Sequence, residues 1–351
     1  MSSGNTNISN EVKRNESEGD SAGRVSQFSY IRTAAAFAIV LLHCFNSSRV
    51  YLVDTLSETE TTTAYAACSA LMWAVPCFLM VTGALLLDRD RVIPASKLFG
   101  KYIRRMITAL VVFTAIFTVI KHYGSPGPVI IEKFFDGLLY NHCMAYLWYL
   151  YLMLALYLLM PVFKAAVNRL SDVQLSCLAA VLLVVCSVLP FASYMGIEGV
   201  PYIPTQIVYG VYLLLGFLLF RHRMNAVAAA LLFAACTMAL PVMTFRLTAA
   251  GIDATEFTGY NSLIVVLQSA AAFSLMMSIR RPAEGIIDDI DRCSFGIYLI
   301  HMLFIRLTIN RLGFDPFALG TASFIALAMV FFLLSYVVTY ELKKLRIFDF
   351  L

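Results

Sequence analysis

Apolar runs as long as a lipid bilayer is thick recur along the whole chain and constrain its fold more than any other feature. A helix needs about twenty residues to cross the hydrocarbon core. Backbone groups find no water there, so each run must satisfy its hydrogen bonds internally, as a helix does. We therefore predict an all-α integral membrane protein, a bundle of about ten transmembrane helices. The runs are residues 28–46, 64–87, 104–121, 145–163, 174–194, 203–220, 226–245, 259–279, 294–312 and 319–341.

Composition excludes a soluble fold of this size. Hydrophobic residues make up 60% of the 351 residues and charged residues only 14%, whereas soluble domains are nearer half apolar and a quarter charged. The net charge of +4 gives no indication of a nucleic-acid partner. The eight cysteines lack C-x-x-C spacing and fall mostly inside apolar runs. We expect no disulfide framework, no structural zinc and no other metal site.

The distribution of Lys and Arg predicts the orientation in the membrane. With both termini on the same side, 19 of the 26 basic residues lie on that side and 6 on the other, with Arg32 inside the first run. Basic residues favour the cytoplasmic side, so we predict a multi-pass protein of a cell (inner or plasma) membrane with both termini cytoplasmic. Residues 1–26 are polar and predict a disordered tail, residues 27–342 the membrane domain, and residues 343–351 a short cytoplasmic tail.

The first apolar run contains two ionisable residues, Arg32 and His43, eleven positions apart. Eleven residues make about three helical turns, which places both side chains on one face about 16 Å apart along the axis. Ionisable groups within a span are costly and indicate function. The alternatives are that Arg32 extends to the cytoplasmic headgroups and that His43 is a neutral histidine bonded to a neighbouring helix.

A basic segment and a polar stripe are further candidates. Six basic residues lie between 89 and 105, and Lys101, Arg104 and Arg105 lead into the third run. They predict a cytoplasmic phosphate site, unless the positive-inside rule and anionic lipid alone explain them. Ser294, Tyr298 and His301 recur at helical spacing along the ninth run, with His301 expected about 10–12 Å from its cytoplasmic side. Such a stripe also occurs where helices pack.

Five stretches in this order resemble the acyltransferase 3 family of integral membrane O-acyltransferases. The resemblance covers roughly residues 28–341. The stretches are Arg32 to His43, Phe78-Leu-Met-Val-Thr-Gly83-Ala-Leu-Leu-Leu, Lys101 to Arg105, Leu147-Trp148-Tyr149-Leu-Tyr151 leading to Leu158-Leu-Met-Pro161, and Ser294-Phe-Gly-Ile-Tyr298-Leu-Ile-His301.

This resemblance implies transfer of an acyl group, usually acetyl, from cytoplasmic acyl-CoA to a hydroxyl of an envelope carbohydrate or lipid-linked glycan. Acetyl-CoA would be the donor substrate, with no permanently bound cofactor. It assigns transfer to Arg32 and His43 and the donor side to the basic element, with Ser294, Tyr298, His301 and Trp148 as supporting residues. Lys101 stands where the family has the first arginine of R-x-x-R, and Tyr146 where members often have histidine.

The helix geometry suggests a mechanism consistent with that resemblance. CoA phosphates would stay near Lys101, Arg104 and Arg105 while the pantetheine arm passes Arg32. His43, neutral near pH 7, would act as general base on the acceptor hydroxyl, and Arg32 would stabilise charge on the thioester oxygen. An acetyl-histidine intermediate remains an alternative.

Two other functions fit the same sequence. A transporter or exporter of polysaccharide or a small anion would use Arg32 to bind substrate and His43 to relay protons, although no repeat relates the two halves of the chain. A membrane module could also serve a separate soluble catalytic partner. The acceptor, the acyl chain length and the oligomeric state are not specified by any motif.

Overall fold

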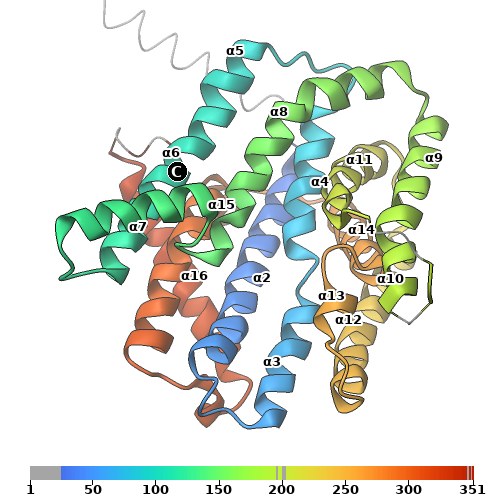
Figure 1. Cartoon of the computed structure of the whole chain (residues 1–351). Helices are drawn as coiled ribbons and strands as arrows, with labels where there is room; N and C mark the ends of the chain where they lie inside the picture. The colour runs from blue at the N-terminus through green and yellow to red at the C-terminus, as the bar shows by residue number, and fades with distance from the viewer. Residues whose placement is uncertain (1–24, 195–196, 200–202, 346–347, 349) are drawn as a thin grey trace, which may run out of the picture.

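The protein is a bundle of helices, most of which run along one common direction (Figure 1). The computed structural model describes residues 25–194, 197–199, 203–345, 348 and 350–351, and no strand occurs among them. The prediction of an all-helical fold is therefore confirmed for this part of the chain. We call the end that carries α5 the upper end and the end that carries the start of α3 the lower end, as in Figure 1.

Eight helical segments among the described residues are long and apolar enough to cross a bilayer. They are α2 (Ser26–Tyr51); α3 (Glu58–Ala70) with α4 (Ala74–Leu86); α5 (Ala95–Lys97) with η1 (Leu98–Ile103) and α6 (Arg104–Lys121); η2 (Ala145–Leu147) with α8 (Trp148–Arg169); α9 (Asp172–Leu183) with η3 (Val184–Val188) and α10 (Leu189–Tyr194); α12 (Ala226–Ala249); α15 (Ile286–Ile305) with η5 (Arg306–Arg311); and α16 (Ser323–Leu342).

Two shorter apolar segments complete the set that the sequence predicts. They are η4 (Thr205–Ile207) with α11 (Val208–Arg221), and α14 (Leu263–Met277). Each of the ten predicted runs thus overlaps one helical segment. Only eight of these ten segments are long and apolar enough to cross a bilayer by themselves. The count of ten crossings and the side of the membrane on which each terminus lies stay predictions. Residues 1–24 of the predicted tail lie outside the described residues, and Ser26 already begins α2.

Helix α7 (Gly127–Tyr140) lies in a segment that was predicted as a loop. It lies across the bundle direction in Figure 1. Its exposed side chains include Ile131, Phe135 and Leu139, and its polar residues alternate with these at helical spacing. In Figure 1 α7 lies at about mid-height of the bundle. The remaining short helices are α13 (Thr255–Thr258) and η6 (Pro316–Leu319).

Helices α4 and α11 pack with their backbones in direct contact. A Cβ added at Gly83 would lie 1.9 Å from the Leu213 carbonyl oxygen, and one at Gly216 would lie 2.0 Å from that of Met80. Small residues let helices in lipid approach closely enough for dispersion to hold them together. This contact positions α4, whose Phe78 and Thr82 line the cavity described below.

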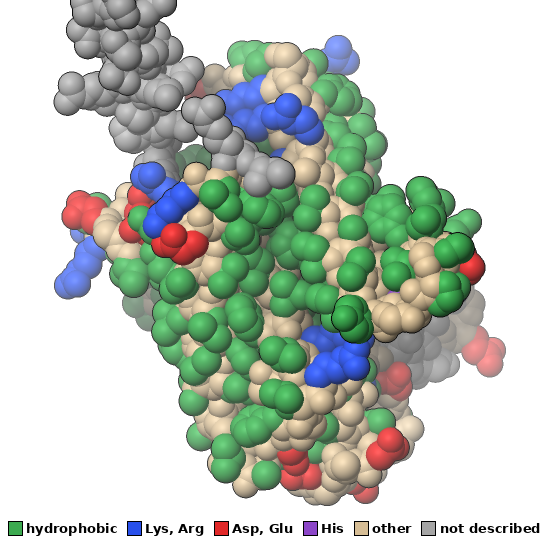
Figure 2. Space-filling model, turned by 90° about the vertical axis from the view of Figure 1, so that its left-hand side faces the viewer, with side chains coloured by type: hydrophobic (Ala, Val, Ile, Leu, Met, Phe, Trp, Pro, Cys, Tyr) green, Lys and Arg blue, Asp and Glu red, His purple; other side chains and the backbone are tan. Residues whose placement is uncertain are grey.

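Helix α15 begins eight residues earlier than the predicted ninth run, after Gly285 with a φ of +58°. Its first turns therefore include Asp291, which was predicted to lie in a cytoplasmic loop. His301 is fifteen residues from the helix start, or about 22 Å along the axis, and its depth of about 10–12 Å from the cytoplasmic side stays a prediction. On the face shown in Figure 2 the side of the bundle is mostly hydrophobic, and basic side chains lie chiefly near the upper end, with a further group lower down.

Candidate functional site

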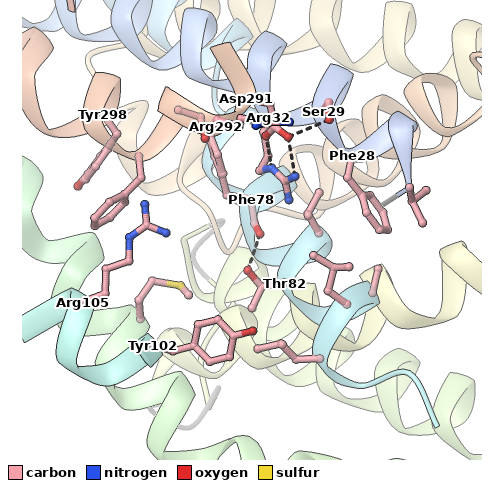
Figure 3. A pocket seen from close by; sticks show the side chains of 18 of the residues that line it. Phe28, Ser29, Arg32, Phe78, Thr82, Tyr102, Arg105, Asp291, Arg292 and Tyr298 are labelled. Atoms are coloured by element: carbon pink, nitrogen blue, oxygen red, sulfur yellow. Dashed lines mark hydrogen bonds and ion pairs between the residues drawn. The ribbon is translucent and has the colours of Figure 1, made fainter. Parts of the chain in front are cut away.

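A cavity of about 1270 Å³ enters the upper half of the bundle between α2, α4, η1, α6, α8 and α15. Its wall combines two kinds of side chain. The cationic ones are Arg32, Arg91, Lys97, Arg105 and Arg292. The aromatic ones are Phe28, Phe78, Tyr102, Tyr149, Tyr157, Phe220, Phe295 and Tyr298. Figure 3 shows that these groups reach the pocket from several helices.

Arg32 is held in this cavity by an ion pair with Asp291 of α15 (Figure 3). Its Nε and Nη2 both donate to the carboxylate, the second over 2.9 Å, and Ser29 Oγ donates to Oδ2 over 2.8 Å. The exposed fraction is 22% for the Arg32 side chain and 2% for Asp291. The guanidinium therefore turns toward a neighbouring helix, and the alternative that it extends to the headgroups does not describe its position.

Sequence reasoning missed Asp291. The signal was present, because three carboxylates lie within the four residues 288–291 directly before an apolar run. The rule that predicts orientation depends only on Lys and Arg, so it does not draw attention to these three carboxylates. An arginine inside a span is itself a reason to look for a carboxylate at the same depth on another helix.

The predicted basic element is divided by the structure. Arg105 lines the cavity; its Nε and Nη2 donate to the carbonyls of Phe350 and Leu351, each over 2.7 Å, and its guanidinium lies 4.4 Å from the centre of the Phe295 ring. Lys101 and Arg104 are exposed and lie outside the cavity lining. The three groups therefore do not converge on one point.

Other basic residues of the same segment lie in different surroundings. Arg91 and Lys97 line the cavity and were not singled out in the sequence. Arg89 instead ends α8: it donates to the carbonyls of Val167 over 3.0 Å and Leu170 over 2.7 Å. Its guanidinium satisfies carbonyls that a helix end leaves without partners, which is a structural role.

His43 and His301 lie side by side, with ring centres 5.2 Å apart. Tyr146 packs edge-on against both, at 6.1 Å and 5.7 Å. His301 is fully buried, and its Nδ1 lies 3.0 Å from the Ile297 carbonyl oxygen. A carbonyl only accepts, so Nδ1 carries the proton and the neutral ring keeps a lone pair on Nε2. Among the described residues Nε2 has no hydrogen-bond partner.

An aromatic layer separates this histidine pair from the cavity. Tyr298 lines the cavity and packs against His301, with ring centres 6.1 Å apart. Its hydroxyl donates to the Tyr146 carbonyl, and the Tyr146 hydroxyl donates to the Leu299 carbonyl over 2.8 Å. These reciprocal bonds join η2, which directly precedes α8, to α15. Neither histidine lines the cavity, whereas Tyr298 and Tyr149 do.

Two further candidate residues occupy different surroundings. Ser294 lines the cavity one turn above Tyr298. Trp148 packs against Tyr209 and Tyr260, each with ring centres 5.5 Å apart, and does not line the cavity. Its neighbour Tyr149 does, so Trp148 acts on the cavity only through the placement of that residue.

The fold and the site together define a polytopic helical protein with a cationic cavity that leads toward a buried histidine pair. Comparison with known proteins agrees: the acyltransferase domain of the acyltransferase 3 family matches residues 25–340, nearly the whole chain. The chain belongs to this family, which indicates a membrane acyltransferase. No curated protein and no solved structure matches the chain.

Proposed function

We propose that this protein is a membrane O-acetyltransferase that moves an acetyl group from acetyl-CoA to a hydroxyl of an envelope carbohydrate or lipid-linked glycan. The observation that supports this proposal best is the cavity, which is cationic around Arg91, Lys97 and Arg105 and aromatic where it approaches His43. Its volume of about 1270 Å³ exceeds the roughly 300–1,000 Å³ of typical small-molecule sites. A long donor with a charged head and a thin arm suits a cavity of this size and lining.

The charged head of the donor stays at the upper end. Phosphates are too strongly hydrated to enter the hydrocarbon, and guanidinium and ammonium groups bind them well. Arg105, Lys97 and Arg91 supply those groups within the cavity. Lys101 and Arg104, exposed on the same segment, add positive potential that draws an anion toward the opening. The upper end then faces the cytoplasm, where acyl-CoA is found.

Arg32 stabilises the charge that develops at the thioester. Asp291 and Ser29 hold its guanidinium in one orientation, which suits a donor that must be placed before the reaction. Nε and Nη2 of Arg32 bind Asp291, and the N–H groups of Nη1 bind the carbonyl oxygen of the donor. Asp291 thus acts as a positioning residue and not as a base.

The histidine pair completes the reaction. The acceptor hydroxyl oxygen bonds to the thioester carbon while His43 takes its proton, and the carbon–sulfur bond breaks to release CoA, whose thiolate recovers the proton. His301, with its free Nε2, lies close enough to orient His43 or the hydroxyl. The Tyr298 side chain lies between the cavity and the histidine pair. Its rotation therefore accompanies entry of the acetyl group.

The test is transfer of radiolabelled acetyl groups by the purified protein in lipid nanodiscs, with an envelope glycan extract as acceptor. We expect His43→Ala to abolish transfer and leave the thermal unfolding temperature close to that of the wild type. His122→Ala is the matched control, because His122 follows α6 outside the cavity lining. Full transfer by His43→Ala would overturn the proposed base. Substrate accumulation in vesicles without acyl-CoA would instead favour transport.

A further inference from the structure

A second group of cations lies below the histidine pair, on the side away from the cavity. Lys121 ends α6, and Arg306 and Arg311 lie in η5. The charges of Lys121 and Arg306 interact, and Arg311 donates to the carbonyl of Ile120, the neighbour of Lys121, over 3.3 Å. Two helical segments therefore bring these three basic residues to the same side of the bundle.

These cations have no anionic partner among the described residues. No ion pair in that part of the chain includes Lys121, Arg306 or Arg311. Asp136 of the nearby α7 pairs with His142 instead, over 3.0 Å. Positive charges that lie close together, as those of Lys121 and Arg306 do, repel one another, and the cost is reduced when an anion binds between them.

Arg306 differs from Lys121 and Arg311 because its side chain is not simply exposed at the surface. An interfacial arginine normally extends its guanidinium into water or headgroups. Arg306 instead lies partly buried, and its Nη1 approaches the Met144 sulfur at 3.1 Å. Its Nε is buried and has no hydrogen-bond partner within the part of the chain that the structure describes. A thioether is a weak acceptor, so the guanidinium is placed to bind an oxygen anion that displaces the flexible Met144 side chain.

The position of this group relates it to the acceptor. Arg306 follows His301 by five residues, about 7.5 Å further along the helix axis. Met144 lies two residues before Tyr146 in the chain, and Tyr146 packs against both histidines. An anion bound here would lie just below the reacting hydroxyl, on the side opposite to the donor cavity.

We infer that Lys121, Arg306 and Arg311 form a phosphate-binding site for the acceptor. The inference rests on the proposed function and specifies its acceptor as a carbohydrate joined to a membrane lipid through phosphate. A phosphodiester linkage carries one negative charge on two unesterified oxygens, and a diphosphate linkage carries about two charges. Either offers several acceptor oxygens to cations from two helices, more than a single carboxylate does. The phosphate fixes the lipid-linked end while the sugar extends toward His43.

Binding of undecaprenyl phosphate to the full-length protein tests the inference. The protein is placed in phosphatidylcholine nanodiscs, and bound lipid is quantified by native mass spectrometry during a titration. We expect Arg306→Gln to weaken binding about tenfold or more, because a charged hydrogen-bonding partner is lost. Arg246→Gln should bind as the wild type does, since Arg246 is an exposed arginine in the last turn of α12. Arg311→Gln, at an exposed position, is the second variant if Arg306→Gln folds poorly.

Two outcomes would overturn the inference. One is equal affinity of the wild type, Arg306→Gln and Arg311→Gln for undecaprenyl phosphate. The other is displacement of that lipid by an equal amount of phosphatidylglycerol, which would make the group a general headgroup site. Coenzyme A binding is measured in the same nanodiscs. Its absence in the wild type would refute the proposed donor function and leave the phosphate result unaffected, so the two failures are distinguishable.

Discussion

Asp291 and Arg32 form a charge pair at a place where water reaches neither group freely. The side-chain exposure is 2% for the acid and 22% for the base. A paired buried charge contributes little net stability, but removal of one partner leaves the other desolvated and unpaired. The pair also joins α2 to α15 at the wall of the cavity. Its loss should therefore affect both stability and transfer.

We predict that Asp291→Asn lowers the free energy of unfolding by about 3 kcal/mol, the lower end of the range for breaking a buried pair because Arg32 is partly exposed. Acetyl transfer should fall through kcat, since Arg32 loses its fixed orientation. Thermal unfolding in detergent and steady-state kinetics measure the two effects. The double variant Arg32→Gln/Asp291→Asn should be less destabilised than the sum of the single changes.

Asp289→Asn is the control for this experiment, because Asp289 lies two residues earlier on α15 and outside the cavity lining. Similar losses in Asp289→Asn and Asp291→Asn would show that the helix start merely needs negative charge. In that case the specific pair with Arg32 would have no special role.

At the scale of elements, the close packing of α4 on α11 determines the shape of one cavity wall. Gly83 and Gly216 admit the opposing backbones, and no side chain fits at either position without movement of a carbonyl. Helix α4 also carries Phe78 and Thr82 into the cavity (Figure 3). A change in the separation of these two helices is therefore expected to alter the cavity that we propose as the donor site.

We predict that Gly216→Ala destabilises the protein by about 1–3 kcal/mol, because the added methyl group overpacks a rigid contact. It should also raise the KM for acetyl-CoA. Gly100→Ala is the matched control: nothing lies within 4 Å of the added Cβ, so the change should be neutral or slightly stabilising. Unfolding temperatures and KM values compare the two. An unchanged Gly216→Ala protein would contradict the close approach of α4 and α11.

At the scale of the whole molecule, the two ends of the bundle differ in charge, and this difference predicts its orientation. The α5 end carries the basic segment from Arg89 to Arg105. The opposite end carries few basic residues apart from the proposed phosphate site. Since basic residues favour the cytoplasmic side, the donor cavity should open to the cytoplasm.

Labelling of introduced cysteines tests this orientation. A maleimide that does not cross membranes should label Thr59→Cys in intact cells and Ser96→Cys only after permeabilisation, both measured above the background of the parent chain. Both positions are exposed, one at the start of α3 and the other in α5. The opposite pattern would place the cavity on the outside and exclude cytoplasmic acyl-CoA as its ligand.

Much of the architecture follows from local sequence. Helical segments follow from apolar length, because lipid leaves the backbone one way to satisfy its hydrogen bonds. Helix α7 escaped this reasoning, since a short amphipathic helix lacks a continuous apolar run. Arg32, His43 and His301 were recognised because ionisable groups within such runs are costly and therefore conspicuous.

The amino-acid sequence by itself determined the helical segments of membrane-spanning length and showed Arg32, His43 and His301 as ionisable residues within them, because both depend on transfer of local groups into lipid. Only the tertiary structure decided how those residues meet. It paired Arg32 with Asp291, placed His43 beside His301, and left Lys101 and Arg104 outside the cavity that Arg105 lines. The reason is that these relations depend on the rotation and depth of each helix. Those are set by packing between helices far apart in the chain, such as the contact of Gly83 and Gly216 with the backbone opposite.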